Sequence, residues 1–441
     1  MWEYFWVLVA LGLIGAWTLG VFFLQKRGLL EPRGLHAAGP FIMWKTRRGR
    51  DFLDRLSRPN RFWRVFGDAS LVIVGLTMAG TTLLLVWEAT LVQSPAVRQN
   101  PPSPDLLLGL PGINRLIPLG YGIFGLAIAI VLHEFAHGVL ARVAKVNIRS
   151  LGIILFIFPI GAFVEPEEEE MKVLPRRDRA RLYAVGPATN ILLAILFAFL
   201  FSSMMSSSVT PVHEGVGIIG FSEPDSPARD AGLQPYTIIT SFNGAEIRSY
   251  AEFVRAKEAT VANQVVPVTT YDGTSYAYYD VPLLSDGAGG SLLGIYGIDT
   301  STEYYYPLSN PDRFGGVPNA ILTYISLPFA GRAPIQDPAA RFYEIQGPLA
   351  VLPAEAFWLL ANAFYWLFWL NVMLGATNAL PAVPLDGGYI FRDALHGLLE
   401  RARAGLSEER RTRVVRNVSY VVALLILALI LWQFIGPRLN M

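Results

Sequence analysis

Six long stretches of the chain consist almost entirely of apolar side chains. A helix needs about 20 apolar residues to cross a hydrocarbon core of about 30 Å. Six stretches meet this length, and they cover residues 5–24, 69–92, 117–143, 182–204, 354–379 and 414–434. The pattern predicts a polytopic α-helical membrane protein with six transmembrane helices.

The basic residues alternate between the connecting segments. Segments 25–68, 144–181 and 389–416 carry 11, 7 and 7 Lys or Arg residues, whereas segment 93–116 carries only two. Lys and Arg accumulate on the cytoplasmic side of a membrane. We therefore expect both ends of the chain to lie outside, together with the long polar segment between the fourth and fifth spans.

The first part of that polar segment has the pattern of a small inserted α+β domain. Short apolar runs bounded by turn residues predict strands at 217–221 and 238–242, and helices at 226–232 and 250–258. The domain resembles a bacterial-type PDZ domain on Ser226-Pro-Ala-Arg-Asp-Ala-Gly-Leu233, Ile238, Asn243-Gly244 and Ile247. The match departs at Pro235-Tyr236-Thr237, where that family usually has Gly-Asp, so a generic α+β insert stays open.

The composition excludes several classes of protein. Of the 441 residues, 53% are hydrophobic and 16% are charged, which excludes an ordinary soluble enzyme because such proteins carry about 25% charged residues. The net charge of +1 provides no basic field for nucleic acid. The sequence has no cysteine, so a metal site has to use His, Asp, Glu or backbone oxygen.

The third apolar stretch contains His133-Glu134-Phe135-Ala136-His137. On a helix, histidines four residues apart lie on one face and can reach the same metal ion, while the glutamate stands beside them as a non-ligand acid. Ionisable residues inside a membrane are costly and usually functional. The alternative is a set of polar residues near the interface, satisfied by backbone partners.

A catalytic zinc ion takes a third protein ligand and keeps one position open. The candidate for this ligand is Asp386, which follows the fifth apolar stretch in a segment with Pro381 and Pro384. The prolines stop a regular helix, and broken helix at membrane depth is tolerated where it lines a cavity. Taken alone, Asp386-Gly387 is equally typical of a turn at the membrane surface.

The motif at 133–137 and the segment 378–388 together resemble the site-2 proteases, zinc metalloproteases that cut inside the membrane. That family combines His-Glu-x-x-His with a later Asn-x-x-Pro-x-x-x-Leu-Asp-Gly, which is matched here by Asn378, Pro381, Leu385, Asp386 and Gly387. The resemblance implies Zn²⁺ held by His133, His137 and Asp386, with Glu134 as the catalytic base.

Three further segments agree with the resemblance. Residues 152–164 are similar to the family's membrane-dipping hairpin, whose edge could pair with a substrate strand, although a surface hairpin is the alternative. Gly186 and Asn190 match a Gly-x-x-x-Asn segment, which implies close helix packing and a polar group for the substrate. The resemblance implies that Asn378 binds the substrate backbone or helps to stabilise an oxyanion, and the alternative is a cap on the broken helix end.

The expected organisation has five parts. They are a two-span region with a basic cytoplasmic loop (1–116), the first part of a catalytic membrane core (117–204), the PDZ-like domain (205–299), an extracytoplasmic linker of unknown structure (300–353) and the second part of the core (354–441).

By this resemblance we expect an intramembrane zinc metalloendopeptidase of regulated intramembrane proteolysis, in the plasma membrane of a prokaryote. Its partners would be the lipid bilayer and transmembrane substrates already cut by another protease, which the PDZ-like domain admits or docks. Two alternatives from other classes remain, a metal or proton transporter and a non-catalytic membrane PDZ scaffold.

Overall fold

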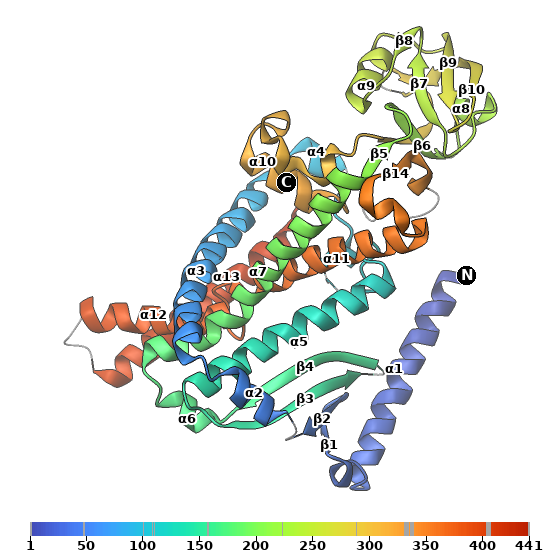
Figure 1. Cartoon of the computed structure of the whole chain (residues 1–441). Helices are drawn as coiled ribbons and strands as arrows, with labels where there is room; N and C mark the ends of the chain where they lie inside the picture. The colour runs from blue at the N-terminus through green and yellow to red at the C-terminus, as the bar shows by residue number, and fades with distance from the viewer. Residues whose placement is uncertain are drawn as a thin grey trace. The chain divides into compact units, whose positions relative to one another are not determined.

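The structure is a computed structural model. It describes the chain except residues 1, 47–48, 100, 108, 110, 157, 223, 288, 330–334, 336–338, 403–406 and 440–441 (Figure 1). The chain forms two compact units. The first comprises Met1–Ile195 with Leu367–Met441, and the second comprises Leu196–Trp366. We describe each unit by itself.

Five helices in the described residues are long and apolar enough to cross a membrane. They are α3 (Asn60–Leu91), α5 (Leu119–Val143), α7 (Arg176–Ser208), α11 (Ala354–Ala379) and α13 (Glu408–Ile435). Each covers one of the predicted apolar stretches to within two residues at either end, so five of the six expected spans are supported. The first predicted stretch lies in α1 (Trp2–Lys26), whose crossing of the membrane stays a prediction.

The first unit also contains a four-stranded antiparallel sheet. Its order is β1-β2-β3-β4, formed by Leu35–Ala38, Phe41–Thr46, Ile148–Phe156 and Phe158–Pro166. The expected hairpin at 152–164 is therefore present, apart from residue 157, which lies outside the described residues. No sequence pattern predicted β1 and β2, which extend the hairpin. The sheet leaves β4 at an edge, and α5 runs alongside this strand (Figure 1).

A polar ladder crosses this sheet. Lys45 on β2 pairs with Glu165 on β4 at 3.0 Å, and the Ser150 hydroxyl on β3 donates to the same carboxylate. Burial raises the pKa of Glu165, but the Ser150 hydroxyl and the Lys45 ammonium outweigh it and hold that pKa below its usual value. Glu165 is therefore bonded into the sheet.

Helices α3, α5 and α7 pack together in the first unit. Leu53 on α2 (Arg50–Leu56) packs against Val139, Leu140 and Leu182, all of them buried. The Arg181 guanidinium on α7 donates to both carboxylate oxygens of Asp68 on α3, at 2.6 and 2.8 Å. Shorter helices of this unit are α4 (Pro95–Gln99) and α6 (Glu168–Lys172).

The fifth span ends where the prolines predict. Helix α11 stops at Ala379, and α12 (Asp386–Ala402) starts after a turn that contains Pro381 and Pro384. Gly387 and Gly388 begin α12 very close to this turn: a Cβ on Gly387 would lie 2.1 Å from the Ala379 carbonyl oxygen. Only glycine fits such an approach, so the Asp-Gly-Gly sequence folds the start of α12 against the end of α11.

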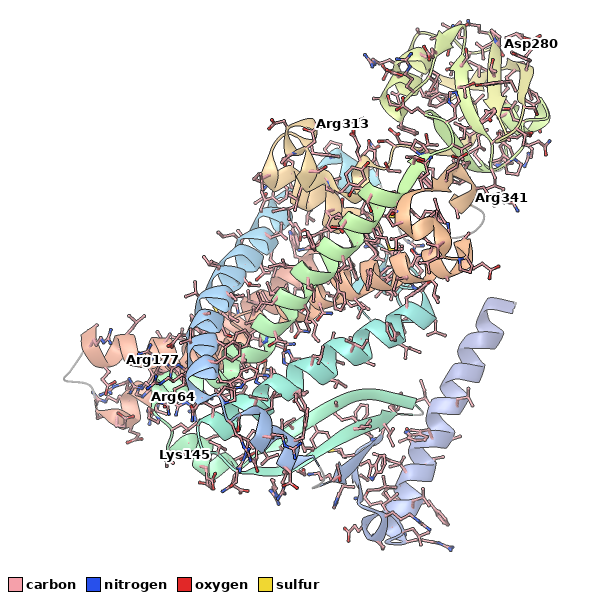
Figure 2. The ribbon with its side chains drawn as sticks, in the orientation of Figure 1. Arg64, Lys145, Arg177, Asp280, Arg313 and Arg341 are labelled. Atoms are coloured by element: carbon pink, nitrogen blue, oxygen red, sulfur yellow. The ribbon has the colours of Figure 1, made fainter. Side chains whose placement is uncertain are left out.

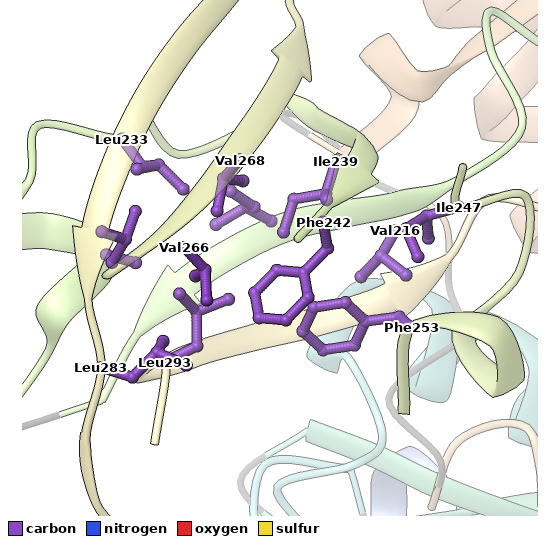
Figure 3. Packing of buried hydrophobic residues seen from close by; sticks show 13 residues of the cluster. Val216, Leu233, Ile239, Phe242, Ile247, Phe253, Val266, Val268, Leu283 and Leu293 are labelled. Carbon is purple, nitrogen blue, oxygen red and sulfur yellow. The ribbon is translucent and has the colours of Figure 1, made fainter. Parts of the chain in front are cut away.

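The second unit contains a sheet with the order β10-β9-β7-β6-β13 and β8 beside β7. Strands β6 (Val216–Phe221) and β7 (Ile238–Phe242) and helices α8 (Pro227–Asp230) and α9 (Tyr250–Glu258) confirm the four predicted elements. The others are β8 (Ala245–Glu246), β9 (Val265–Tyr271), β10 (Tyr276–Pro282), β11 (Leu284–Ser285), β12 (Ser291–Leu292) and β13 (Ile295–Asp299). Its core gathers around Phe242 and Phe253 (Figure 3).

The segment expected as a linker of unknown structure contains several short elements. Helix α10 (Val317–Ser326) and short 3₁₀ turns precede β14 (Tyr343–Ile345), which pairs with β5 (Val209–Pro211) directly after α7. The Phe342 ring packs on Gly217, where a Cβ would lie 2.6 Å from it. This segment therefore packs against the predicted domain, and no sequence pattern predicts that contact.

Candidate metal centre

The structure brings His133 and His137 on α5 together with Asp386 at the start of α12. Their Nε2 atoms lie 3.1 Å apart. The Asp386 Oδ2 atom lies 3.2 Å from the His133 Nε2 and 3.3 Å from the His137 Nε2. Among the described residues, these three form the one group of His, Cys, Asp and Glu side chains with metal-ligand spacing. Two sites more than 240 residues apart in sequence thus converge on one point.

The hydrogen bonds of both imidazoles leave their Nε2 lone pairs facing that point. His137 donates from Nδ1 to the Leu182 carbonyl oxygen at 2.7 Å. His133 donates from Nδ1 to the Asn190 Oδ1 at 2.6 Å. With a proton fixed on each Nδ1, the two Nε2 atoms are acceptors. Two lone pairs and a carboxylate oxygen aimed at one another repel unless a cation lies between them.

The donor set fits zinc. Zinc–nitrogen bonds of about 2.0–2.1 Å in tetrahedral geometry place neighbouring ligand atoms about 3.3 Å apart. The observed separations of 3.1, 3.2 and 3.3 Å agree with that edge length. Two His and one Asp leave a fourth position, as in catalytic zinc sites.

Gly186 on α7 allows this arrangement. A Cβ at this position would lie 2.3 Å from the His137 Nε2 and 2.7 Å from the His133 Nε2. The imidazoles cannot move aside, because their Nδ1 atoms are held by hydrogen bonds. Gly186 was expected to permit close helix packing, and the neighbours that it admits are the two imidazoles.

Asn190 lies one turn further along α7 and is fully buried. Its Nδ2 donates to the Ala129 carbonyl oxygen at 3.1 Å and to the Asn371 Oδ1 at 2.8 Å, which fixes its Oδ1 as the acceptor for His133. All of its polar atoms are used by the protein. The sequence suggested a substrate contact for Asn190; we propose instead that it positions His133.

A cavity of about 340 Å³ opens onto the centre. His133, His137, Asp386, Glu134 and Asn378 all line it, together with Val164 of β4 and Tyr183 of α7. The Glu134 Oε2 accepts the Val164 backbone N–H at 3.2 Å. Asn378 donates to the Leu374 carbonyl oxygen of its own helix at 3.1 Å.

Two neighbours of the centre were missed by sequence analysis. The Leu182 carbonyl carries no signal in a side-chain motif. Tyr183, which stacks on Tyr389 at 4.8 Å, belongs to no motif that sequence analysis identified. Both follow from the register of α7, which Gly186 sets against α5.

Comparison with known proteins finds relatives that include an uncharacterised protein and named proteases. The chain is 26% identical over 394 residues to an uncharacterised protein of Methanocaldococcus jannaschii, covering 88% of this chain and 84% of that protein. It is 22% identical to zinc metalloprotease RasP of Shouchella clausii, over 63% of this chain and 64% of the relative. It is 24% identical to the regulator of sigma-W protease RasP of Bacillus subtilis, over 53% and 55%.

The family comparison covers most of the chain. A model of peptidase family M50 matches residues 121–428, which include both histidines, Glu134 and Asp386. Together with the zinc-type donor set, this match shows that the chain belongs to peptidase family M50.

Proposed function

We propose that this chain is an intramembrane zinc metalloprotease that hydrolyses peptide bonds in or near the transmembrane helices of membrane-anchored regulatory proteins. One observation carries the proposal: two histidines inside an apolar helix converge with Asp386 at the start of α12 on one point, and Glu134 beside them is not in the ligand group. His133 lies 14 residues after the start of α5, or about 21 Å along it. This depth is within the span, towards its C-terminal end.

The residues of the centre have separate roles. His133, His137 and Asp386 would hold the zinc ion, which supplies Lewis acidity for the scissile carbonyl and for a water molecule. Glu134 accepts a proton from water and passes it to the leaving amine. Its bond to the Val164 N–H aims the carboxylate along β4, where the substrate is proposed to lie. Asn378, which also lines the cavity, would hold the substrate backbone.

The substrate is proposed to bind as an extended strand. β4 is an edge strand, and Val164 on that edge lines the cavity. An edge strand offers unpaired backbone groups to an extended peptide. A transmembrane helix already satisfies its own backbone, so it has to unwind locally before it can pair in this way. Helix-destabilising residues in the substrate should therefore favour cleavage.

The sheet at 216–299 is proposed to act as a PDZ-like selectivity domain, outside the membrane. It has its own hydrophobic core. The antiparallel pair of β5 and β14 joins the segments that precede and follow the sheet. Replacing residues 213–300 with a short Gly-Ser linker should therefore keep the catalytic unit folded. If the domain admits only pre-cut substrates, the shortened protein will cleave full-length substrates that the intact protein refuses. Unchanged selectivity would count against the filter.

The experiment for the main proposal reconstitutes the protein with a single-span peptide in vesicles and locates the cut by mass spectrometry. Glu134→Gln should retain zinc and lose cleavage. The matched control is Glu88→Gln, which removes another acid from a span. Glu88 accepts a hydrogen bond from the Gln433 side chain at 2.9 Å. Glu88→Gln should cleave normally.

The same pair of variants discriminates the alternatives. A transporter needs polar groups across the bilayer, so both variants would impair ion flux into vesicles and neither protein would cut the peptide. A scaffold would bind the peptide without cutting it in any variant. An active Glu134→Gln protein would end the proposal.

A further inference from the structure

A second cavity, of about 220 Å³, lies where α3 and α7 begin and α5 ends. Apolar side chains and charged side chains line it together. Its residues are Arg64, Leu140, Val143, Ala144, Lys145, Leu174, Pro175, Asp178 and Arg181. Figure 2 shows Arg64 and Lys145 near one another at this end of the unit, beside Arg177. None of these residues belongs to the metal centre.

The charges of this basic cavity do not balance. Three cations, Arg64, Lys145 and Arg181, face one carboxylate, Asp178, which leaves a net charge of +2. Arg181 is paired with Asp178 at 2.8 Å and with Asp68 at 2.6 Å. Within the described part of the chain, neither Arg64 nor Lys145 has a carboxylate within salt-bridge distance. Two exposed cations are therefore available to an anion.

The basic cavity lies at the boundary between the charged helix ends and the apolar spans. On α7, four arginines and Asp178 precede Leu182, and no charged residue follows until the helix ends. On α3, Arg61, Arg64 and Asp68 precede an apolar stretch that extends to Glu88. This is the level that lipid headgroups occupy, and basic pockets between transmembrane helices bind anionic headgroups there.

We propose that the basic cavity binds the phosphate of an anionic phospholipid. Arg64 and Lys145 contact the phosphate, and Leu140, Val143 and Leu174 contact the glycerol and the start of the acyl chains. The N-terminus of the long helix α7 adds a favourable partial charge. The C-terminus of α5 opposes it, and the two unpaired cations outweigh that effect.

The basic cavity is connected to the metal centre through both helices. Leu140 lies one turn after His137 on α5. Arg181 directly precedes Leu182, whose carbonyl oxygen holds His137. A lipid phosphate bound between these positions restrains α5 against α7, so lipid binding should also raise the thermal stability of the protein.

The test measures lipid binding to the full chain, purified and delipidated in detergent, by native mass spectrometry. The probes are phosphatidylglycerol, phosphatidylcholine and inorganic phosphate. The variant is Arg64→Gln/Lys145→Gln. The matched control is Arg58→Gln/Arg61→Gln, which removes the same charge from exposed arginines nearby that do not line the basic cavity. Arg64→Lys/Lys145→Arg tests whether the fold tolerates changes at these positions.

Each surface Lys or Arg strengthens the binding of anionic lipid about fivefold, so the loss of two should weaken phosphatidylglycerol binding about 30-fold. The control and the charge-preserving variant should bind as the wild type does, and phosphatidylcholine should bind weakly throughout. Equal weakening in both Gln variants, or equal binding of the two lipids, would overturn the proposal. Displacement of phosphatidylglycerol by millimolar inorganic phosphate would overturn the lipid assignment and leave a free-phosphate site.

Discussion

Asn190→Ala tests whether a residue outside the ligand set controls zinc binding. In the structure, Asn190 is the acceptor that keeps the proton of His133 on Nδ1, at 2.6 Å. Alanine removes this acceptor and allows the imidazole to rotate or to change its tautomer. The change also leaves the Ala129 carbonyl oxygen and the Asn371 Oδ1 without their buried donor.

The size of the effect follows from the position of the contact. Loss of a hydrogen-bond partner behind a metal-ligating histidine costs about 10–100-fold in metal affinity. This corresponds to about 1.4–2.7 kcal/mol of binding free energy. The unpaired buried groups lower the folding stability as well, by about 1–3 kcal/mol. Only the first effect should appear as weaker zinc binding.

The assay is a competition titration of zinc against a fluorescent chelator with the purified protein in detergent. Asn362→Ala is the matched control. Asn362, in α11, is buried as Asn190 is, and its side chain donates to the Ile335 carbonyl oxygen at 2.6 Å. Within the described residues, none of its hydrogen bonds involves the three ligand side chains. This variant should lose stability and keep its zinc affinity. Asn190→Asp keeps an acceptor for His133 and should retain zinc better than Asn190→Ala. Wild-type zinc affinity in Asn190→Ala, or the same loss in Asn362→Ala, would refute the reasoning.

Three further predictions address other parts of the account. Gly186→Ala should abolish zinc binding, because the added Cβ would lie 2.3 Å from the His137 Nε2. A Cβ on Gly75 meets no atom within 4 Å, so Gly75→Ala should bind zinc normally in the same titration. Ala162→Pro should slow peptide cleavage and leave zinc affinity intact. Like the Val164 N–H, the Ala162 N–H lies on the edge of β4 that faces away from β3, and proline removes it. Unchanged cleavage rates would argue against strand pairing. The pKa of Glu165 is held below its usual value in the folded protein, so the stability that its carboxylate contributes is present near neutral pH and is lost as the pH falls through the lowered pKa. Thermal unfolding should show wild type more stable than Glu165→Gln at pH 7 and equal at the acidic end, and a pH-independent difference would contradict the assignment.

Sequence patterns predicted the helices of the membrane core well, because length and hydropathy decide them. The predicted span at 354–379 coincides with α11, and the predicted helix at 250–258 coincides with α9. The spacing of His133 and His137 gave one half of the centre directly. Asp386 was predicted because Pro381 and Pro384 in its segment break a helix at membrane depth. Broken helix at that depth is tolerated only where it lines a cavity or is covered by protein.

The contacts that sequence analysis missed are long-range and mostly use the backbone. β2 joins β3 across about 100 residues of sequence, and nothing in the strand of residues 41–46 specifies this partner. Asn190 was predicted to contact the substrate because the family motif identifies the residue but not its hydrogen-bond partners. Those partners, His133, Ala129 and Asn371, become clear only from the register of α7 in the structure. The 3₁₀ turns after residue 300 lack the periodicity that predicts regular elements.

The central claim is that two imidazoles and one distant carboxylate hold a single zinc ion. X-ray absorption at the zinc edge, on the purified protein with one zinc per chain, tests this claim most directly. We predict a first shell of two imidazole nitrogens with oxygen ligands, and the loss of bound zinc in Asp386→Ala. A shell with one imidazole or none, or an unchanged spectrum in Asp386→Ala, would contradict the account.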